Sequence, residues 1–409
     1  AHTCDASIVE VGDGTALYSF TPAEGTGDST CTLEVVCSDG INDATQAITI
    51  TIHELPKWTQ TSASQDRHSC GIYAGHLYCW GFNDNGQLGV GDTTNRTVPT
   101  EILGGYSDWE WVDTGDVHSC GIRAGMLYCW GDNDNGQIGN DSTTDSASPI
   151  MIDNTFTWVE IAAGYDHTCA ITDTSELYCW GRNNRGQLGL GDTTTRRTPQ
   201  QVSASNWESI TCGQEHTCAI DGGHLYCWGD ENEGQLGNGT NANSYNWTPG
   251  EVLGAYGDWL YVDVNEDVSC GIRHASGILY CWGKNDRSQL GDGSTSTSAS
   301  PLALAATGWV DVGTGRDHAC AINDGGELWC WGDDDNGQCG DGTVGGGNVT
   351  TPTQVGSGTD WIQISGGQDH TCGIIASGQA YCWGDNSQGQ VGDDSGNDQG
   401  SPASVVNPF

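Results

Sequence analysis

The chain has 409 residues, and 12 lysines and arginines stand against 54 aspartates and glutamates, which gives a formal net charge of −42. So acidic a chain argues against nucleic acid as a partner, because phosphate contacts need a basic footprint, and equally against anionic membrane surfaces. The sequence has no apolar run long enough to span a bilayer. Its 19 cysteines predict an oxidising compartment. These cysteines and the acidic charge favour an extracellular or cell-surface location. The chain starts at Ala1 rather than Met, so we expect that a signal peptide or a longer precursor was removed.

Residues 1–55 predict a small, immunoglobulin-like β-domain with four strands, SIVEV, ALYSFT, CTLEVVC and TQAITITIHE. The end of this segment, Ser38-Asp39-Gly40 and the alternating strand after it, resembles a bacterial immunoglobulin-like or cadherin-like module. Such modules usually have seven strands, so four leave open edges. We keep two alternatives, a capping domain docked on the rest of the chain and a module completed by another subunit. Its odd number of cysteines leaves one for another chain or as a free thiol, and the sequence does not pair Cys4, Cys31 and Cys37.

Residues 56–409 consist of a unit that occurs seven times, with leading cysteines 49 to 52 residues apart. A period of about 50 residues with strand-like content is typical of solenoids and propellers. Seven units of about four strands favour an all-β, seven-bladed propeller. Each unit opens with a tryptophan, at Trp58, Trp109, Trp158, Trp207, Trp259, Trp309 and Trp361.

The centre of each unit predicts a β-hairpin. In the first unit Cys70 pairs with Cys79 across a two-residue turn, Ala74-Gly75, in which glycine supplies a positive φ. Opposed strand residues lie close enough for a disulfide. A zinc site is the alternative, but the spacing is not that of zinc ligands and the pairs are not grouped in fours. We therefore predict seven disulfides, Cys70–Cys79, Cys120–Cys129, Cys169–Cys179, Cys218–Cys227, Cys270–Cys281, Cys320–Cys330 and Cys372–Cys382.

Strand alternation divides each hairpin into two faces. The cysteines share one face with Ile72 and Leu77, and Tyr78 and Trp80 share the other. The residue opposite the aromatic position is always Gly or Ala, which favours packing of rings between blades. After the hairpin we expect a GQLG turn and a strand that begins near a proline, at Pro99, Pro149, Pro199, Pro249, Pro301, Pro352 and Pro402. No strand is left over, so we expect ring closure by contact between the first and last units, with a blade that mixes strands from both ends as the variant.

The unit resembles the regulator of chromosome condensation repeat. The resemblance rests on G-x-x-H-x-C-x-I, on L-Y-C-W-G-x-N-x-x-G-Q-L-G-x-G-D and on T-P-x-x-V, and it covers about 350 of 409 residues. It implies a seven-bladed propeller, and the cysteine-paired version is similar to secreted bacterial relatives. The founding member promotes nucleotide exchange on a small GTPase and binds chromatin. We do not transfer that activity, because this acidic chain has no basic tail and no insertion long enough for an extra hairpin.

A histidine precedes the leading cysteine in six of the seven units, at His68, His118, His167, His216, His318 and His370. A ring of imidazoles suggests a metal site, but the seventh unit has Val268 and the positions lie on different blades. We therefore expect structural hydrogen bonds within each blade and no metal ligand.

Two turns have the composition of calcium-binding loops, residues 132–136 (DNDNG) and residues 333–337 (DDDNG). The distal glutamate of such loops is missing, because Gln137 and Gln338 follow the glycine, and Asx-turn chemistry explains the pattern without an ion. We therefore predict no cofactor, with calcium as the alternative.

Sequons and two further cysteines complete the candidate sites. The sequons, which are surface glycosylation sites only if the host modifies them, begin at Asn95, Asn140, Asn238, Asn246 and Asn348. Cys212 and Cys339 lie outside the paired pattern, two blades apart. Either both are buried free thiols, or one of them links two chains.

No catalytic motif occurs in the sequence, neither a nucleophile elbow, nor HExxH, nor a phosphate loop. We therefore predict a non-enzymatic protein. The first hypothesis is a structural subunit of a surface layer or filament that self-associates through residues 1–55. The alternative is a monomeric module that binds glycans or proteins on a face of the propeller.

Overall fold

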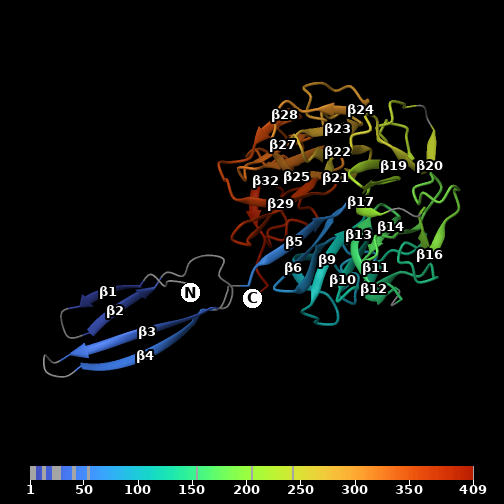
Figure 1. Ribbon diagram of the computed structural model, residues 1–409. Helices are drawn as coiled ribbons and strands as arrows, with labels where there is room; N and C mark the ends of the chain where they lie inside the picture. The colour runs from blue at the N-terminus through green and yellow to red at the C-terminus, as the bar shows by residue number, and fades with distance from the viewer. Residues whose placement is uncertain are drawn as a thin grey trace. The chain divides into compact units, whose positions relative to one another are not determined.

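The computed structural model describes the backbone of four strands within residues 1–55 and the side chains of residues 56–408, apart from 153–154, 204–205 and 242–243. Every regular element in these residues is a β-strand, and the main fold is the predicted all-β propeller (Figure 1). The chain forms two compact units, Ala1–Pro56 and Lys57–Phe409. A search of the described residues for a helix able to cross a bilayer finds none.

The first unit contains two hairpins. β1 (Ala6–Val11) pairs with β2 (Thr15–Phe20), and β3 (Ser29–Ser38) pairs with β4 (Asp43–Ile52). Among the described residues these are two separate two-stranded sheets, so each strand has one ladder partner and one further edge. The immunoglobulin-like completion of this unit stays a prediction. Cys4 lies outside the described residues, and of Cys31 and Cys37 only the backbone, in β3, is described.

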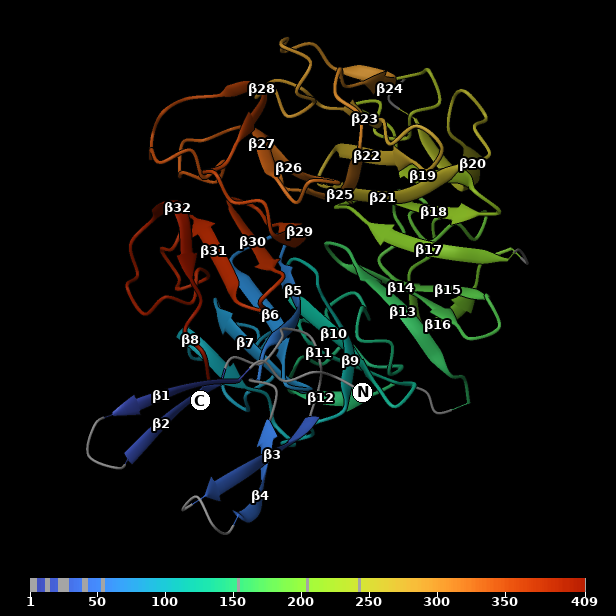
Figure 2. The same ribbon diagram turned by 60° about the vertical axis from the view of Figure 1, so that its left-hand side comes forward.

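The second unit is a ring of seven four-stranded blades, each built from consecutive strands (Figure 2). The first three blades are β5 (Trp58–Ala63), β6 (His68–Tyr73), β7 (His76–Gly81), β8 (Arg96–Glu101); β9 (Trp109–Thr114), β10 (His118–Arg123), β11 (Met126–Gly131), β12 (Ser146–Met151); and β13 (Trp158–Ala163), β14 (His167–Thr172), β15 (Leu177–Gly181), β16 (Arg196–Gln201). The others are β17 (Trp207–Cys212), β18 (His216–Asp221), β19 (His224–Asp230), β20 (Tyr245–Glu251); β21 (Trp259–Asn265), β22 (Val268–Arg273), β23 (Leu279–Gly283), β24 (Ser298–Ala303); β25 (Trp309–Thr314), β26 (His318–Asn323), β27 (Leu328–Gly332), β28 (Val349–Gln354); and β29 (Trp361–Gly366), β30 (His370–Ile375), β31 (Ala380–Gly384), β32 (Gln399–Ser404).

The hairpin at the centre of each blade has the register that the sequence predicts. In blade 1 Cys70 lies opposite Cys79, and Gly71 lies opposite Tyr78. Ala74 and Gly75 form the turn with φ values of 53° and 82°. Two consecutive positive φ values are those of the tight turn whose twist matches the strands, which is why glycine occurs here.

Alternation along the strands places a different kind of side chain on each face of a blade. The cysteine face of blade 1, with Ile72 and Leu77, packs against Trp109 and Trp130 of blade 2 in one buried cluster. Seven such clusters occur among the described residues, one at each junction between blades. The aromatic rings therefore pack between blades, as the small residues opposite them predicted.

The fourth strand of each blade differs from the expectation. We expected these strands to begin near the prolines, but β8 begins at Arg96, three residues before Pro99. The ladder between β7 and β8 shifts its register between Cys79 and Gly81, and Pro99 lies in the irregular stretch. Proline cannot donate to a ladder, so it is tolerated at such a shift on an outer edge strand.

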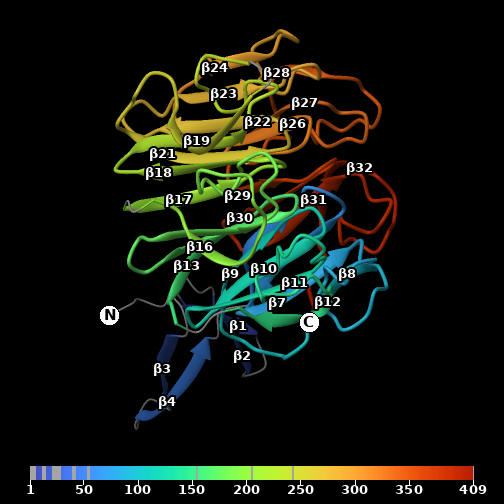
Figure 3. The same cartoon turned by 90° about the vertical axis from the view of Figure 1, so that its right-hand side faces the viewer.

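The ring closes by contact between blade 7 and blade 1, without a blade of mixed strands (Figures 2 and 3). The Trp58 amide donates to the Gly378 carbonyl at 2.9 Å, and the same bond occurs at an ordinary junction, where the Trp109 amide donates to the Gly75 carbonyl at 3.0 Å. The Trp58 indole also donates to the Asn407 side chain at 3.1 Å. The closing junction is therefore built like an ordinary junction.

Candidate functional site

Seven disulfides staple the central hairpins, and none of them crosses between blades. They join the cysteines directly opposite each other, Cys70–Cys79, Cys120–Cys129, Cys169–Cys179, Cys218–Cys227, Cys270–Cys281, Cys320–Cys330 and Cys372–Cys382. Each closes a loop of about ten residues, which stabilises a fold by roughly 2–3 kcal/mol when chain entropy is the dominant effect. The blade-to-blade contacts therefore rest on packing and hydrogen bonds.

The repeated histidines link neighbouring blades, which corrects the expectation of bonds within a blade. His118 Nε2 lies 2.9 Å from the Thr168 hydroxyl on the next blade, and that hydroxyl donates to the Gln137 backbone carbonyl at 2.8 Å. The same carbonyl accepts the Trp180 indole N–H at 2.9 Å. Since the hydroxyl uses its hydrogen on the carbonyl, the imidazole Nε2 must be the donor. We call this set of contacts the latch.

Latches occur at six of the seven junctions. The imidazole-to-hydroxyl distances are 2.8 to 3.1 Å at His68–Ser119, His118–Thr168, His167–Thr217, His216–Ser269, His318–Thr371 and His370–Ser69. Burial lowers the pKa of these histidines to about 3, or about 4 for His370, so they are neutral. Each Nδ1 atom is buried without a hydrogen-bond partner in the described residues. The imidazoles lie on separate blades, and each is engaged with a hydroxyl of the next blade, so the structure assigns them a role in joining the blades.

The seventh junction replaces both latch partners at once. Val268 takes the histidine position of blade 5, and Ala319 takes the hydroxyl position on blade 6. Both side chains are completely buried in one hydrophobic cluster. A histidine here would face a methyl group, and a serine would face an isopropyl group, so the two replacements fit each other. The structure therefore explains why Val268 is tolerated.

The first strand of every blade is an edge strand facing the axis, and side chains from the preceding blade satisfy its free amides. Gln60 accepts from the Val112 amide at 2.9 Å, and Glu160 accepts from the Ile210 amide at 3.0 Å. The side chain two positions further along the first strand also accepts from an amide of the next blade. Asp113 accepts from the Ala163 amide at 2.8 Å. A buried amide without a partner is costly, so these polar side chains stabilise the centre of the ring.

The first strands of the blades surround a channel along the axis of the ring, and the carboxyl groups in this channel are strongly desolvated. Burial raises the pKa of Asp113, Glu160 and Asp311 to about 7 and that of Asp263 to about 6. Three of these four, all but Asp311, line a cavity of about 150 Å³. Raised carboxyl pKa values are also a mark of catalytic sites. Here each carboxylate already accepts a backbone amide from the next blade, which gives it a structural role.

At the other end of the channel lies an acidic pocket of about 290 Å³. Gln65 crosses the axis and donates to the Cys212 backbone carbonyl of blade 4 at 2.7 Å. Burial, and then the neighbouring Asp66 and Asp166 charges, raise the pKa of Asp116 to about 8. Arg316 offsets part of this negative charge by ion pairs, including one to Asp369 at 3.0 Å.

The two turns with calcium-like composition differ in structure. In the first, carboxylate oxygens of Asp132, Asp134 and Asp145 lie within 4.8 Å of one another. Asp132 also accepts hydrogen bonds from Asn85 and Gln137. The first turn thus brings together three ligands of the kind calcium prefers, and calcium there stays the untested alternative to the prediction of no cofactor.

In the second turn the acids already have partners. Asp333 and Asp335 pair with Arg287 at 3.4 and 3.6 Å. Asp334 turns inward and accepts from the Cys339 amide at 2.9 Å, as Asn133 accepts from the Ile138 amide in the first turn.

Cys212 and Cys339 are free, buried thiols. Burial raises the pKa of both thiols, Cys212 and Cys339, well above the usual value of a cysteine, which makes both poor nucleophiles. Cys212 lies near His167 and Cys169. Cys169 is bonded to Cys179, so it has no thiolate to offer a metal.

The sequon asparagines have different surroundings. Asn348 is exposed, and Asn95, Asn140, Asn238 and Asn246 are half-buried. Both ends of the Asn95 amide are engaged, since it accepts from the Asn83 amide and donates to Gln388. Use of the sequons stays a prediction, for which Asn348 is the most accessible position.

The repeat matches a family model along most of the second unit. The regulator of chromosome condensation (RCC1) repeat model matches residues 74–122, 124–171, 175–220, 222–275, 276–322 and 325–374. The chain belongs to the RCC1 repeat family. A second RCC1 repeat model matches residues 158–187, 207–235, 309–338 and 361–390.

Curated relatives align over parts of the chain. The ultraviolet-B receptor UVR8 of Arabidopsis thaliana is 32% identical over 213 residues, which are 48% of this chain and 46% of the receptor. The human X-linked retinitis pigmentosa GTPase regulator is 28% identical over 143 residues, 33% of this chain and 14% of that protein. The chain thus spans less than half the length of these relatives.

Solved structures support the fold. Prp20p of Saccharomyces cerevisiae, reported with its binding to Gsp1p and histones, superposes with a TM-score of 0.73 at 20% identity and covers 85% of this chain and 88% of that one. Human WBSCR16 superposes with a TM-score of 0.70 at 20% identity, covering 81% of this chain and 90% of that one. At this identity the likeness shows the seven-bladed ring alone.

The polar side chains that accept from the amides of the inner strands were not predicted from the sequence. Their signal is a polar residue two or four positions after the leading tryptophan, as at Gln60, Asp113 and Glu160. The hydroxyl residue that follows five of the six histidines, and that follows Val268 in the remaining unit, was not predicted either. The joint replacement at Val268 and Ala319 shows in the sequence once the copies are aligned.

Proposed function

We propose that this RCC1-family propeller is an extracellular, non-enzymatic structural protein that assembles through its first unit. The observation that carries the proposal is that the ring closes within Lys57–Phe409, while β1 to β4 form two hairpins with one further edge on each strand among the described residues. An open strand edge is a template for pairing with another chain.

The second unit suits exposure outside the cell. Seven buried disulfides, one in each blade, are what an oxidising environment forms and maintains. Acidic side chains far outnumber basic ones, which keeps such a surface soluble at high local concentration. Strand pairing from one copy to the next is head-to-tail, so it produces a fibre unless the rotation closes a ring.

Protein binding on a propeller face is the alternative. It is favoured by a protein of the same fold, since Prp20p, which is yeast RCC1, is described with Gsp1p and histones and also bound to Kap60. A monomeric module of this kind would use the ring, and the first unit would be dispensable for its oligomeric state.

The deciding experiment compares the full chain with a variant that begins at Lys57. Sedimentation and negative-stain electron microscopy should show concentration-dependent assemblies of the full chain and single rings of the variant. Matched thermal midpoints would establish that the variant keeps an intact ring. Single particles of the full chain at high concentration would reject the assembly and favour the binding module.

A further inference from the structure

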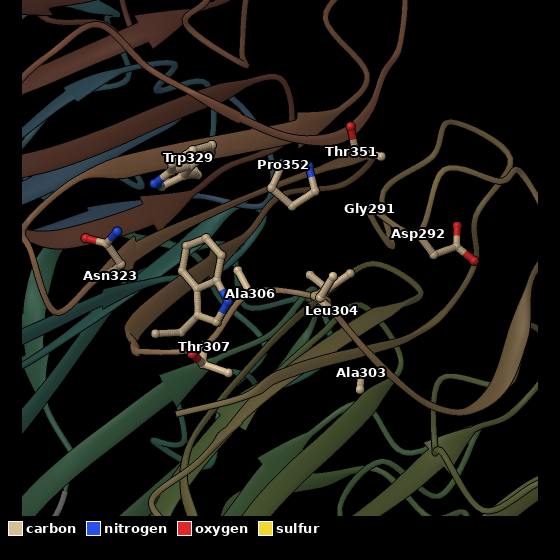
Figure 4. Close-up of a pocket in the computed structure, with 12 residues that line it drawn as sticks. Gly291, Asp292, Ala303, Leu304, Ala306, Thr307, Asn323, Trp329, Thr351 and Pro352 are labelled. Carbon is tan, nitrogen blue, oxygen red and sulfur yellow. The ribbon is translucent and has the colours of Figure 1, made fainter. Parts of the chain in front are cut away.

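We propose that the junction between blades 5 and 6 contains a binding pocket for a small aromatic molecule. The pocket has a volume of about 420 Å³ and lies between the loop that follows β24 and the outer part of blade 6 (Figure 4). Leu304, Trp309, Trp329 and Pro352 line it with large apolar side chains, and Asp292 also lines it. This inference is independent of the proposed assembly.

Three other junctions place an aromatic ring of the chain itself in this position. In the loop between blades 4 and 5, Tyr256 lies 6.0 Å from the Trp259 ring and 5.9 Å from the Tyr280 ring. Arg273 covers Tyr256 at 3.9 Å and pairs with Asp258 at 2.7 Å. A ring from the chain itself therefore fills the space and a cation closes it.

The same arrangement recurs elsewhere with its own residues. Between blades 1 and 2, Arg123 lies 3.5 Å from the Tyr106 ring and pairs with Asp108 at 2.7 Å. Between blades 2 and 3, Phe156 lies 5.4 Å from Trp158 and 4.8 Å from Tyr178. Three junctions thus contain an aromatic ring contributed by the connecting loop.

We call the ring, the arginine that covers it and the aspartate that pairs with the arginine the lid. The junction between blades 5 and 6 lacks all three of these residues. Ala306 lies three residues before Trp309, as Tyr256 lies three residues before Trp259. Asn323 takes the place of the arginine, and Gly308 takes the place of the aspartate. The connecting loop, residues 304–308, is also two residues shorter than residues 252–258. The space filled by Tyr256 at one junction is therefore left open at the other.

The partner rings at the open junction are enlarged. Trp329 replaces the tyrosine that the other six hairpins have, and its ring lies 6.5 Å from that of Trp309 in an edge arrangement. The indole N–H groups of both have no hydrogen-bond partner in the described residues. The Trp158 N–H is also unpaired beside Phe156, so packing of a ring, rather than a bond to the indole, is the interaction that selects the ligand.

The size and chemistry of the pocket fit one or two aromatic rings. An apolar cavity of about 150 Å³ is enough to bind benzene. Aromatic pairs at 4.5–7 Å are favourable beyond the area they bury. A phenol-like ring would reproduce what Tyr256 does in its own junction, with its hydroxyl directed to the open, polar edge.

The test measures binding of p-cresol, the tyrosine side-chain analogue, to the full chain by calorimetry and ligand-observed NMR. We expect one site with a dissociation constant of about 1 mM or below, and at least tenfold weaker binding of 4-methylcyclohexanol. Ala306→Tyr should place a ring in the pocket and weaken p-cresol binding at least tenfold. Failure of the full chain to bind p-cresol, or equal binding by Ala306→Tyr, would overturn the proposal.

A matched variant tests the equivalence of the junctions without changing the proposed site. Tyr256→Ala should open a second pocket, so that the stoichiometry rises from one to two. This result does not depend on whether Ala306→Tyr folds. A folded Tyr256→Ala protein that still binds one molecule would show that an absent lid does not create a site and would refute the reasoning. An intact set of disulfides and a cooperative thermal transition establish folding in each case.

Discussion

The junction between blades 5 and 6 offers a direct measurement of what a latch contributes. We predict that Val268→His destabilises the ring, because its Nε2–H would point at Ala319 and find no acceptor. A buried donor without a partner costs about 1–3 kcal/mol. The double variant Val268→His with Ala319→Ser should recover about 1–2 kcal/mol of this, because the serine can accept from the imidazole and donate to the Gln289 carbonyl, which already accepts the Trp331 indole.

The assay is thermal unfolding with the disulfides intact, at pH 7.5, where an imidazole is neutral. Unfolding entropy is about 2.1 cal/mol/K per residue, so for a ring of roughly 350 residues each kcal/mol shifts the midpoint by roughly 1–2 °C. Val268→His should lower the midpoint by roughly 1–4 °C, and the double variant should regain roughly 1–3 °C of this. The reciprocal pair, His118→Val and Thr168→Ala, is the control, because it should produce a second apolar junction that is more stable than Thr168→Ala alone. Additive effects of both pairs would show that the two positions are not coupled and would refute the latch.

Three further predictions concern the channel, the closing junction and the staples. Asp311→Asn should flatten the pH dependence of stability. The pKa of Asp311 in the folded state, about 7, lies above its unfolded value, so its contribution to stability is present below about pH 4 and is lost as the pH rises through 7. Chemical denaturation at pH 5 and pH 8 measures this loss of stability. The same difference between the two pH values in Asp311→Asn and in the unchanged protein would contradict the prediction. Gln363→Ala should lower the free energy of unfolding by about 1–3 kcal/mol, because the Thr61 amide loses its acceptor at 3.0 Å. Gln60→Ala should lower it by the same amount at an ordinary junction. A much larger effect at Gln363 would show that the closing junction is special. Cys120→Ala with Cys129→Ala should cost roughly 2–3 kcal/mol without opening the ring, a prediction that fails if the remaining blades lose their cooperative transition in calorimetry.

The sequence alone predicts the parts of the fold that depend on short-range spacing. The Cys70–Cys79 register follows from the two-residue turn between the strands, and the two faces of each hairpin follow from strand alternation. The number of blades follows from the repeat. All of these depend on residues less than about 60 positions apart, where turn geometry and periodicity determine the pairing.

The contacts that could not be predicted from the sequence are those between adjacent blades. His118 reaches a hydroxyl 50 residues away in sequence, and Gln60 reaches the Val112 amide 52 residues away. A histidine that repeats once per blade looks the same whether its partner is in its own blade or in the next. The prediction that the strand begins near Pro99 was wrong, because a register shift that the sequence does not reveal leaves no ladder hydrogen bond for an N–H at this position to donate.

The manner of closure has a consequence for engineering. Trp58 and Asn407 are hydrogen-bonded, so the points where the chain enters and leaves the ring are neighbours. The closing junction has the backbone bond and the latch that ordinary junctions have, so no specialised junction holds the ends. Rejoining these ends and reopening the chain before Trp109 should give a ring with the same blades in a new order. A foreign chain could equally contain the whole ring as one insertion, entering and leaving at a single place on its rim.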